Sequence, residues 1–336
     1  MRHPSWIAGH LRQSFLPARR QRVGPIGIDY RDGFVRIVQV ASDRRSHVVA
    51  SACVAYDQAV PERSTEAIMH AIDGGGFRGR ACVLAVPSTT VRCISLTVSD
   101  AEDATIIGEL ERLLPERFGV DRLECDFVRL GGSGDGGLEI AAIAADRASL
   151  ERIAHPLIDE GLWPEAIEPG FLAVARACTR TARRASDRGR LRVAAELTET
   201  GAVVMVLQGQ SLLHVQPLAS RAELPAALRS AVVEAERLGG PRGQVHAELL
   251  PEIRIAGSAA YEVGFLEQVE RLTGLPVRHD DQLGTLATAY AEIGVHASDR
   301  GGAAAWAGAL GAAFRPLAEA SATRHEPLAA SSREAA

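Results

Sequence analysis

The sequence contains no lysine, so all 37 of its basic residues are arginines. This absence excludes the lysine of a phosphate-binding P-loop and a lysine that forms a Schiff base with a carbonyl substrate. Cysteine is also scarce: the five cysteines are scattered, none belongs to a Cys-x-x-Cys pair, and no histidine cluster accompanies them. Neither a zinc site nor a disulfide framework is indicated, and we expect reduced thiols in a cytosolic protein.

Long apolar runs and an excess of positive charge are missing as well. The best candidate for a membrane span, 301–314, is shorter than a bilayer-crossing helix and rich in glycine and alanine. We expect neither a signal peptide nor a transmembrane segment. A net charge of −5, without a basic stripe interleaved with aromatics, argues against nucleic-acid binding. What remains is a chain of 336 residues with a 46% hydrophobic fraction, long enough for more than one soluble globular domain.

The most informative stretch is PIGIDYRDGFVRIVQV at 25–40. Its alternating apolar residues predict a strand that ends near the acid Asp29, a tight turn at Asp32-Gly33, and a second strand. A third strand is expected at 47–56. Taken alone, this stretch is better explained by an ordinary hairpin with one acid near its tip than by a site for a ligand, because turn chemistry accounts for Asp-Gly.

The same pattern returns in LRVAAELTETGAVVMVLQGQSLLHV at 191–215. A strand leads to the acid Glu196, a polar turn follows at 198–201, and two more strands are expected at 203–207 and from Leu212. Two strand–acid–turn–strand units predict two duplicated halves that face each other. Two hairpin turns in this arrangement can hold an anion between them through backbone N–H groups.

Two prolines are expected to interrupt secondary structure, one in a helix and one between strands. A helix from Ala101 to about Arg117 is predicted to be capped by Ser99 or Asp100 and to be kinked or ended by Pro115. Strands are predicted on either side of Pro251.

Several stretches together resemble the PilM family of actin-like pilus assembly proteins and, more remotely, FtsA. They are the stretch at 25–40, VLAVPSTTVRCISLTV at 83–98, ELERLLPERFGVDRLECDFVRL at 109–130, the segment 138–169, and IRIAGSAAYEVGFLEQVERLTGLPV at 253–277. The resemblance covers roughly 24–315. It implies an α/β, two-lobed actin-like fold of the duplicated ribonuclease H-like kind, with an inserted small α+β subdomain.

The resemblance also implies an organisation of the chain into six parts. They are a basic N-terminal extension at 1–22, the first part of the first core subdomain at 23–87, the inserted subdomain at 88–165, the return and crossover at 166–185, the second core subdomain at 186–315, and a disordered tail at 316–336.

An actin-like fold implies a site for ATP and magnesium between the lobes. The resemblance assigns this site to Asp29, Asp32, Gly33, Arg36, Glu196, Thr198, Thr200, Gly201, Gly257 and Ser258. The family pattern, however, has glycine two positions after each acid, where this chain has Arg31 and Thr198. Arg31 restricts the approach of a phosphate and Asp32 repels its charge. These departures favour weakening or loss of nucleotide binding, with no catalytic residue and no protein-held metal.

The function implied is that of a cytoplasmic scaffold, peripheral at the inner membrane through its partner. That partner is a single-span inner-membrane pilus assembly protein whose N-terminal peptide binds between the first core subdomain and the inserted one, in a groove lined by strands and the helix at 101–117. The resemblance leaves self-association open. Three alternatives also remain: an actin-like ATPase or kinase-type enzyme, an FtsA-like filament, and a component of a type II secretion platform.

Overall fold

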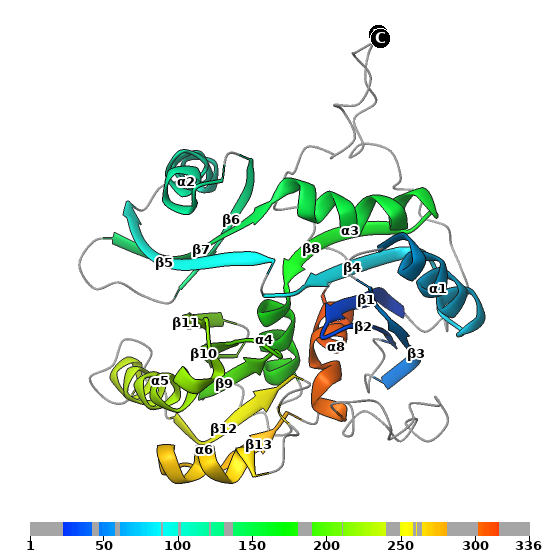
Figure 1. The fold of residues 1–336 in the computed structure, drawn as a ribbon. Coiled ribbons are helices and arrows are strands. Elements are labelled where there is room, and N and C mark those ends of the chain that lie inside the picture. Colours follow the sequence, from blue (N-terminus) through cyan, green and yellow to red (C-terminus); the bar gives the residue numbers. More distant parts are fainter. Residues whose placement is uncertain are drawn as a thin grey trace, which may run out of the picture.

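The computed structural model contains two α/β halves beside a small third layer (Figure 1). The described residues are 23–41, 47–57, 61–88, 90–99, 102–120, 122–130, 137–180, 190–209, 211–239, 249–257, 260, 264–280 and 302–315. The predicted N-terminal extension, the predicted tail and the crossover residues 181–189 lie outside these ranges. Within the described part of the chain, no helix is both long enough and apolar enough to cross a membrane.

The first half is a five-stranded sheet in the order β3-β2-β1-β4-β8. An antiparallel meander forms β1 to β3, and β4 and β8 continue the sheet parallel to β1. The strands are β1 (Val23–Arg31), β2 (Phe34–Ala41), β3 (His47–Ala55), β4 (Ala81–Val86) and β8 (Trp163–Pro169). One face packs against α1 (Pro61–Gly74) and α3 (Arg147–Asp159) through Ile28, Ile68 and Leu157.

The second half repeats this topology in the order β11-β10-β9-β12-β13, again with an antiparallel meander and two parallel strands. The strands are β9 (Leu191–Leu197), β10 (Ala202–Gln208), β11 (Ser211–Leu218), β12 (Leu249–Ala256) and β13 (Val277–His279). The outer face packs against α5 (Leu224–Leu238), which follows the short helix η2 (Arg221–Glu223), and against α6 (Phe265–Thr273). The predicted duplication is therefore present in the strand order of the two sheets.

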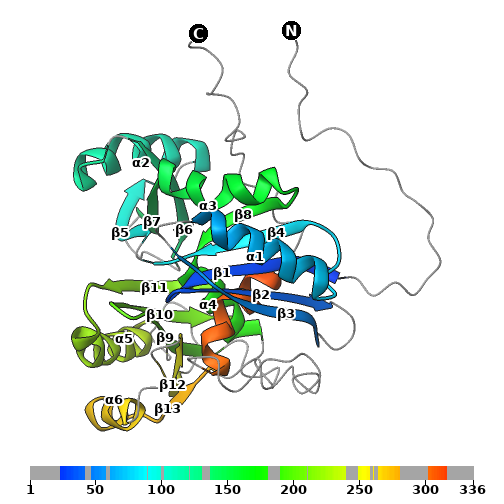
Figure 2. The ribbon, with the colours of Figure 1, turned by 45° about the vertical axis from the view of Figure 1, so that its right-hand side comes forward.

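Two helices lie side by side between the sheets (Figures 1 and 2). α4 (Gly170–Arg180) covers the inner face of the second sheet, and α8 (Ala307–Ala313), preceded by η4 (Ala303–Trp306), covers the inner face of the first. They approach so closely that a Cβ atom at Gly311 would overlap the backbone of α4.

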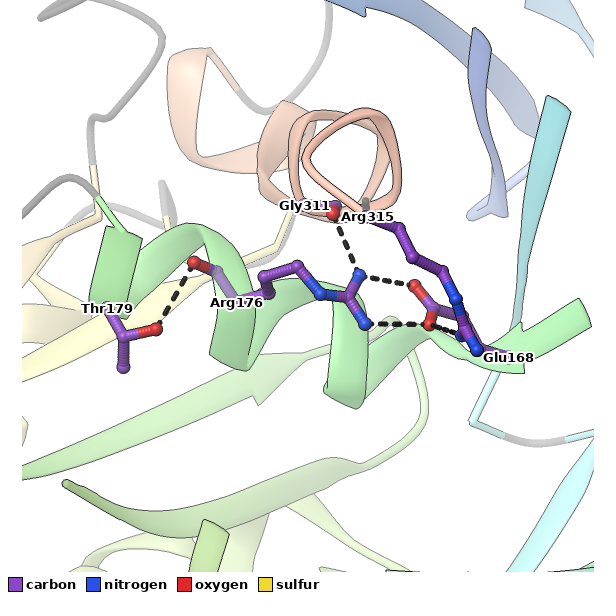
Figure 3. Close-up of polar contacts among 5 residues, drawn as sticks. All are labelled: Glu168, Arg176, Thr179, Gly311 and Arg315. Carbon is purple, nitrogen blue, oxygen red and sulfur yellow. Dashed lines mark hydrogen bonds and ion pairs between the residues drawn. The ribbon is translucent and has the colours of Figure 1, made fainter. Parts of the chain in front are cut away.

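Glu168, at the end of β8, joins α4 to α8 (Figure 3). Its buried carboxylate accepts hydrogen bonds from Arg176 Nη1 at 2.7 Å and Nη2 at 2.8 Å. Arg176 Nη1 also donates to the Gly311 carbonyl at 2.8 Å, and Arg315 donates to Glu168 at 2.7 Å. Thr179 Oγ1 donates to the Arg176 carbonyl at 3.3 Å in the last turn of α4. A two-pronged arginine–carboxylate contact is geometrically specific, so it fixes the orientation in which Arg176 donates to the Gly311 carbonyl of α8.

The third layer is a three-stranded antiparallel sheet in the order β5-β7-β6, covered on one face by a helix. We call it the inserted layer; its elements are β5 (Val91–Ser99), α2 (Asp103–Phe118), β6 (Leu123–Arg129) and β7 (Gly137–Asp146). Its other face contributes Ala141 and Ile143 to a core shared with Val203 and Leu212 of the second half. The inserted layer therefore contacts both halves, since β5 also continues directly from the first sheet (Figure 2).

Four details differ from the sequence-based expectations. The helix predicted from Ala101 begins at Asp103 with Glu102 at its N-cap; Ser99 belongs to β5, and Asp100 lies outside the described residues. Pro115 does not end this helix, because Gly119 does so in a left-handed conformation and donates to the Pro115 carbonyl. β12 runs through Pro251 without a break, with a register shift between Leu249 and Ile253 that accommodates the missing N–H. The short β13 was not predicted.

Candidate functional site

The two acids predicted from the repeated pattern occupy equivalent places in the two sheets. Asp29 lies on β1, opposite Arg36 of β2, and Glu196 lies on β9, opposite Val203 of β10. Each is on the central strand of its sheet, so both side chains are fully buried. A buried carboxylate is costly unless it is paired, so each of these acids requires a partner.

That partner is Arg31, whose guanidinium lies between the two acids. Its Nη2 atom is 3.1 Å from Asp29 Oδ1 and 2.8 Å from Glu196 Oε1, and the arginine side chain is 1% exposed. Ser88 Oγ donates to the other oxygen of Glu196, Oε2, at 2.6 Å. We call Asp29, Arg31 and Glu196 the Arg31 bridge. The guanidinium therefore fills the space between the two carboxylates, where the resemblance implies a site for ATP and magnesium.

The electrostatics of the Arg31 bridge depend mainly on the Arg31 cation. Burial raises the pKa of Asp29 and of Glu196, and the charge of Arg31 opposes both rises. Arg36 lowers the pKa of Asp29 further, and the hydrogen bond from Ser88 lowers that of Glu196. The two acids in turn raise the pKa of Arg31 against the effect of burial, so the arginine stays charged.

Two glycines close the space around the bridge. A Cβ atom at Gly170, the first residue of α4, would come within 2.7 Å of Arg31 Nη2 and 2.8 Å of Glu196 Oε1. A Cβ atom at Gly308 of α8 would overlap Asp29 Oδ2. The backbones of α4 and α8 therefore approach the Arg31 bridge so closely that a residue with a side chain would not fit at either glycine.

The two hairpin turns also contact each other. Asp32 and Gly33 both have positive φ angles, 51° and 73°, as a two-residue hairpin turn requires. Asp32 Oδ1 accepts a hydrogen bond from the Glu199 amide at 3.1 Å. In the second turn, Thr198 Oγ1 donates to the Gly201 carbonyl and accepts from the Gly201 amide. The backbone amides of Glu199 and Gly201, which could otherwise donate to a bound anion, therefore already donate to side chains of the two turns.

The remaining predicted site residues lie around this centre. Arg36 is buried with its guanidinium 5.5 Å from the centre of the Phe34 ring, and Thr200 is exposed. Gly257, which directly follows β12, has φ +107°, and a Cβ atom there would overlap the Leu197 carbonyl oxygen. The chain at Gly257 therefore packs against the end of β9. Ser258 lies outside the described residues.

This set of groups does not suit a magnesium–nucleotide complex. The space beside both carboxylates is taken by an arginine cation, and glycine backbone closes it from two helices. The sequence identified Arg31 only as an obstacle to a phosphate and missed Ser88, Gly170 and Gly308, because nothing in their local pattern reports a contact between distant elements.

A second feature is a pocket of about 410 Å³ between the first sheet and the inserted layer. We call it the boundary pocket. Its lining comes from the end of the first meander, the β4–β5 connection, the inserted layer and the start of α3: Tyr56, Pro87, Thr90, Arg92, Val120, Leu123, Ala144, Ala145, Asp146, Ser149, Arg152 and Ile153. The groove expected from the sequence was to be lined partly by the helix at 101–117, but α2 contributes no residue to this pocket. Apolar, hydroxyl-bearing and charged side chains, among them two arginines and Asp146, thus line a space where two structural units meet.

Comparison with known proteins identifies the fold. The chain matches no protein-family profile and no curated protein sequence. It is similar to a solved structure of the PilM–PilN type IV pilus biogenesis complex, with 15% sequence identity and a TM-score of 0.64, over 88% of this chain and 99% of that one. The two-lobed actin-like α/β fold expected from the sequence is confirmed.

Two other solved structures are more distant. One is the cytoplasmic domain of EpsL, an inner-membrane component of the type II secretion system of Vibrio cholerae, with 12% identity, a TM-score of 0.43, and coverage of 68% of this chain and 80% of that one. The other is a Bacteroides thetaiotaomicron protein with an actin-like ATPase fold, with 9% identity, a TM-score of 0.44, and coverage of 76% and 90%.

Proposed function

We propose that this protein is a scaffold of a type IV pilus or related assembly machine, which binds the N-terminal cytoplasmic peptide of a single-span inner-membrane protein. The observation that carries this proposal is the boundary pocket, which lies between the first sheet and the inserted layer in a chain whose fold matches that of a PilM–PilN complex. Its mixed apolar and polar lining suits an extended peptide, which needs apolar pockets for side chains and polar groups for its backbone. The protein would be cytoplasmic and held at the membrane by this partner.

A matched pair of valine substitutions tests the binding site. Val120 lines the boundary pocket, whereas Val233 is 64% exposed on α5 of the second half. We expect Val120→Arg to weaken binding of the partner's N-terminal peptide by about tenfold or more, because a long charged side chain then fills part of the pocket. Val233→Arg should bind the peptide as the wild type does. Fluorescence anisotropy of a labelled peptide measures both, and equal affinity of the two variants would place the binding surface elsewhere.

We further propose that nucleotide binding is weak or lost. The Arg31 bridge supports this, because a nucleotide phosphate or its magnesium ion would have to displace a buried cation from two carboxylates. An ATPase or kinase-type enzyme would instead need open turns on the phosphates and an acid free to orient water.

The expected result with purified protein is no saturable binding of magnesium-ATP and no turnover near the ~1–1,000 per second typical of enzymes. Isothermal titration and phosphate release measure the two quantities. Asp29→Asn serves as the control for contaminating ATPases, since activity that survives this change does not arise at the Arg31 bridge. Micromolar binding that disappears in Asp29→Asn would overturn the proposal.

A further inference from the structure

The turn between β4 and β5 contacts the Arg31 bridge and also lines the boundary pocket. Ser88 donates to Glu196 of the Arg31 bridge at 2.6 Å, while its neighbours Pro87 and Thr90 line the boundary pocket. The Thr90 amide donates to the Pro87 carbonyl at 2.9 Å, which closes the turn. A segment of four residues therefore contacts the second half with one side chain and forms the pocket wall with two others.

We propose that Ser88 is a positioning residue through which contact between the two halves sets the shape of the boundary pocket and hence its affinity for a peptide. The order of contacts is Arg31 to Glu196, Glu196 to Ser88, and Ser88 to the pocket wall. This inference rests on the proposed function as far as the peptide is concerned. The link between the halves and the pocket wall stands on the contacts themselves.

The physical basis is a strong hydrogen bond between a rigid acceptor and a short turn. Glu196 is fully buried on the central strand β9, and Arg31 holds its other oxygen, so the carboxylate is fixed in place. A hydroxyl donor to a carboxylate is a charge-assisted bond, roughly twice as strong as one between neutral groups. Ser88 itself is only half-buried and lies between the strands β4 and β5, where a turn has no ladder hydrogen bonds to hold it. Without the serine hydroxyl, the turn loses this hydrogen bond to the second half.

The geometry makes the pocket wall sensitive to this loss. Pro87 and Thr90 flank Ser88 within the same turn, so a rotation that moves residue 88 away from Glu196 also moves both pocket residues. In actin-like folds with open turns, a bound ligand could join the halves. In this chain the built-in arginine takes that place, so we expect the pocket to be formed without any small-molecule ligand.

The test compares Ser88→Ala, Ser88→Thr and Ser95→Ala in the full chain. Ser95 is an exposed serine on the neighbouring strand β5, so its substitution is the matched control. The first measurement is amide hydrogen exchange of residue 90 without any ligand. We expect exchange about tenfold faster in Ser88→Ala, and exchange as in the wild type in Ser88→Thr, which keeps the hydroxyl, and in Ser95→Ala.

The second measurement is the affinity for the labelled N-terminal peptide of the membrane partner. We expect about tenfold weaker binding in Ser88→Ala and recovery in Ser88→Thr. If the wild type binds no peptide, the proposed function fails, whereas faster exchange at residue 90 in Ser88→Ala still supports the link between the halves and the pocket wall. If Ser88→Ala leaves both the exchange and the affinity unchanged, the hydroxyl only satisfies a buried carboxylate oxygen and the inference is wrong.

Discussion

Replacing Arg31 by methionine is expected to lower the free energy of unfolding by about 3–5 kcal/mol, because it leaves two buried carboxylates without their counter-ion. Methionine retains much of the side-chain volume, so the change removes mainly the charge and its hydrogen bond to Asp29. Urea denaturation followed by circular dichroism measures the loss. Arg80→Met is the matched control: the Arg80–Asp73 ion pair has side chains 43% and 58% exposed, and losing it should cost about 0–1 kcal/mol.

The pH dependence of this loss separates charge from packing. Burial already raises the pKa values of Asp29 and Glu196, and both rise further once Arg31 is gone. The folded variant then binds more protons than the unfolded chain at every pH between the unfolded carboxyl pKa of about 4 and the raised folded values. Its stability therefore falls as the pH rises through this range, and its deficit relative to the wild type should be smaller at about pH 5 than at about pH 7.5. A deficit that is the same at both pH values would show that packing, not charge, is the cause.

The second large effect is expected from Gly311→Ala. A Cβ atom at this position would overlap the Ala173 carbonyl of α4, so α8 can accept it only by moving away from α4, which would disturb its packing on the first sheet. The same movement would strain the hydrogen bond from Arg176 to the Gly311 carbonyl. We expect a loss of about 3 kcal/mol or more in the free energy of unfolding, at the upper end of the cost of overpacking.

Gly108→Ala is the matched control for this substitution. Gly108 lies inside α2 with nothing within 4 Å of a Cβ atom, and it is exposed. Alanine there should raise the stability by about 0.4–1 kcal/mol, because it restricts the unfolded chain and suits a helix. Thermal or urea unfolding should show a lower free energy of unfolding for Gly311→Ala and a higher one for Gly108→Ala if α8 packs against α4 as closely as the structure shows. Similar stabilities for both variants would contradict it.

The sequence predicts well those parts of the fold that are encoded locally. Period-two alternation and the Asp32-Gly33 pair predict the first hairpin, which the structure contains as β1 and β2. The repeated pattern predicts that Asp29 and Glu196 lie on equivalent strands of two duplicated units, whereas the central position of β1 and β9 is known only from the structure. These features depend on neighbouring residues along the chain, which a single sequence displays.

The parts that escape prediction are contacts between distant segments. Arg31 follows Asp29 by two residues, but its partner Glu196 belongs to the other half, and no periodicity reports that meeting. The run at 301–314 is almost uniformly small and apolar, so it lacks the polar face that marks an amphipathic helix. α8 is buried over its whole length, and such a helix cannot be told from any other apolar run by its pattern.

The position of α8 has a consequence for how the chain folds during synthesis. The first sheet is encoded near the N-terminus, yet its inner face is covered by Trp306 and Leu310, which pack on Val38 and Val40. Nearly the whole chain must leave the ribosome before this core can close, and contacts of such long sequence separation slow folding. The nascent first half therefore exposes the apolar face that includes Val38 and Val40 until the α8 segment has been synthesised, and we expect chains that stop before this segment to aggregate.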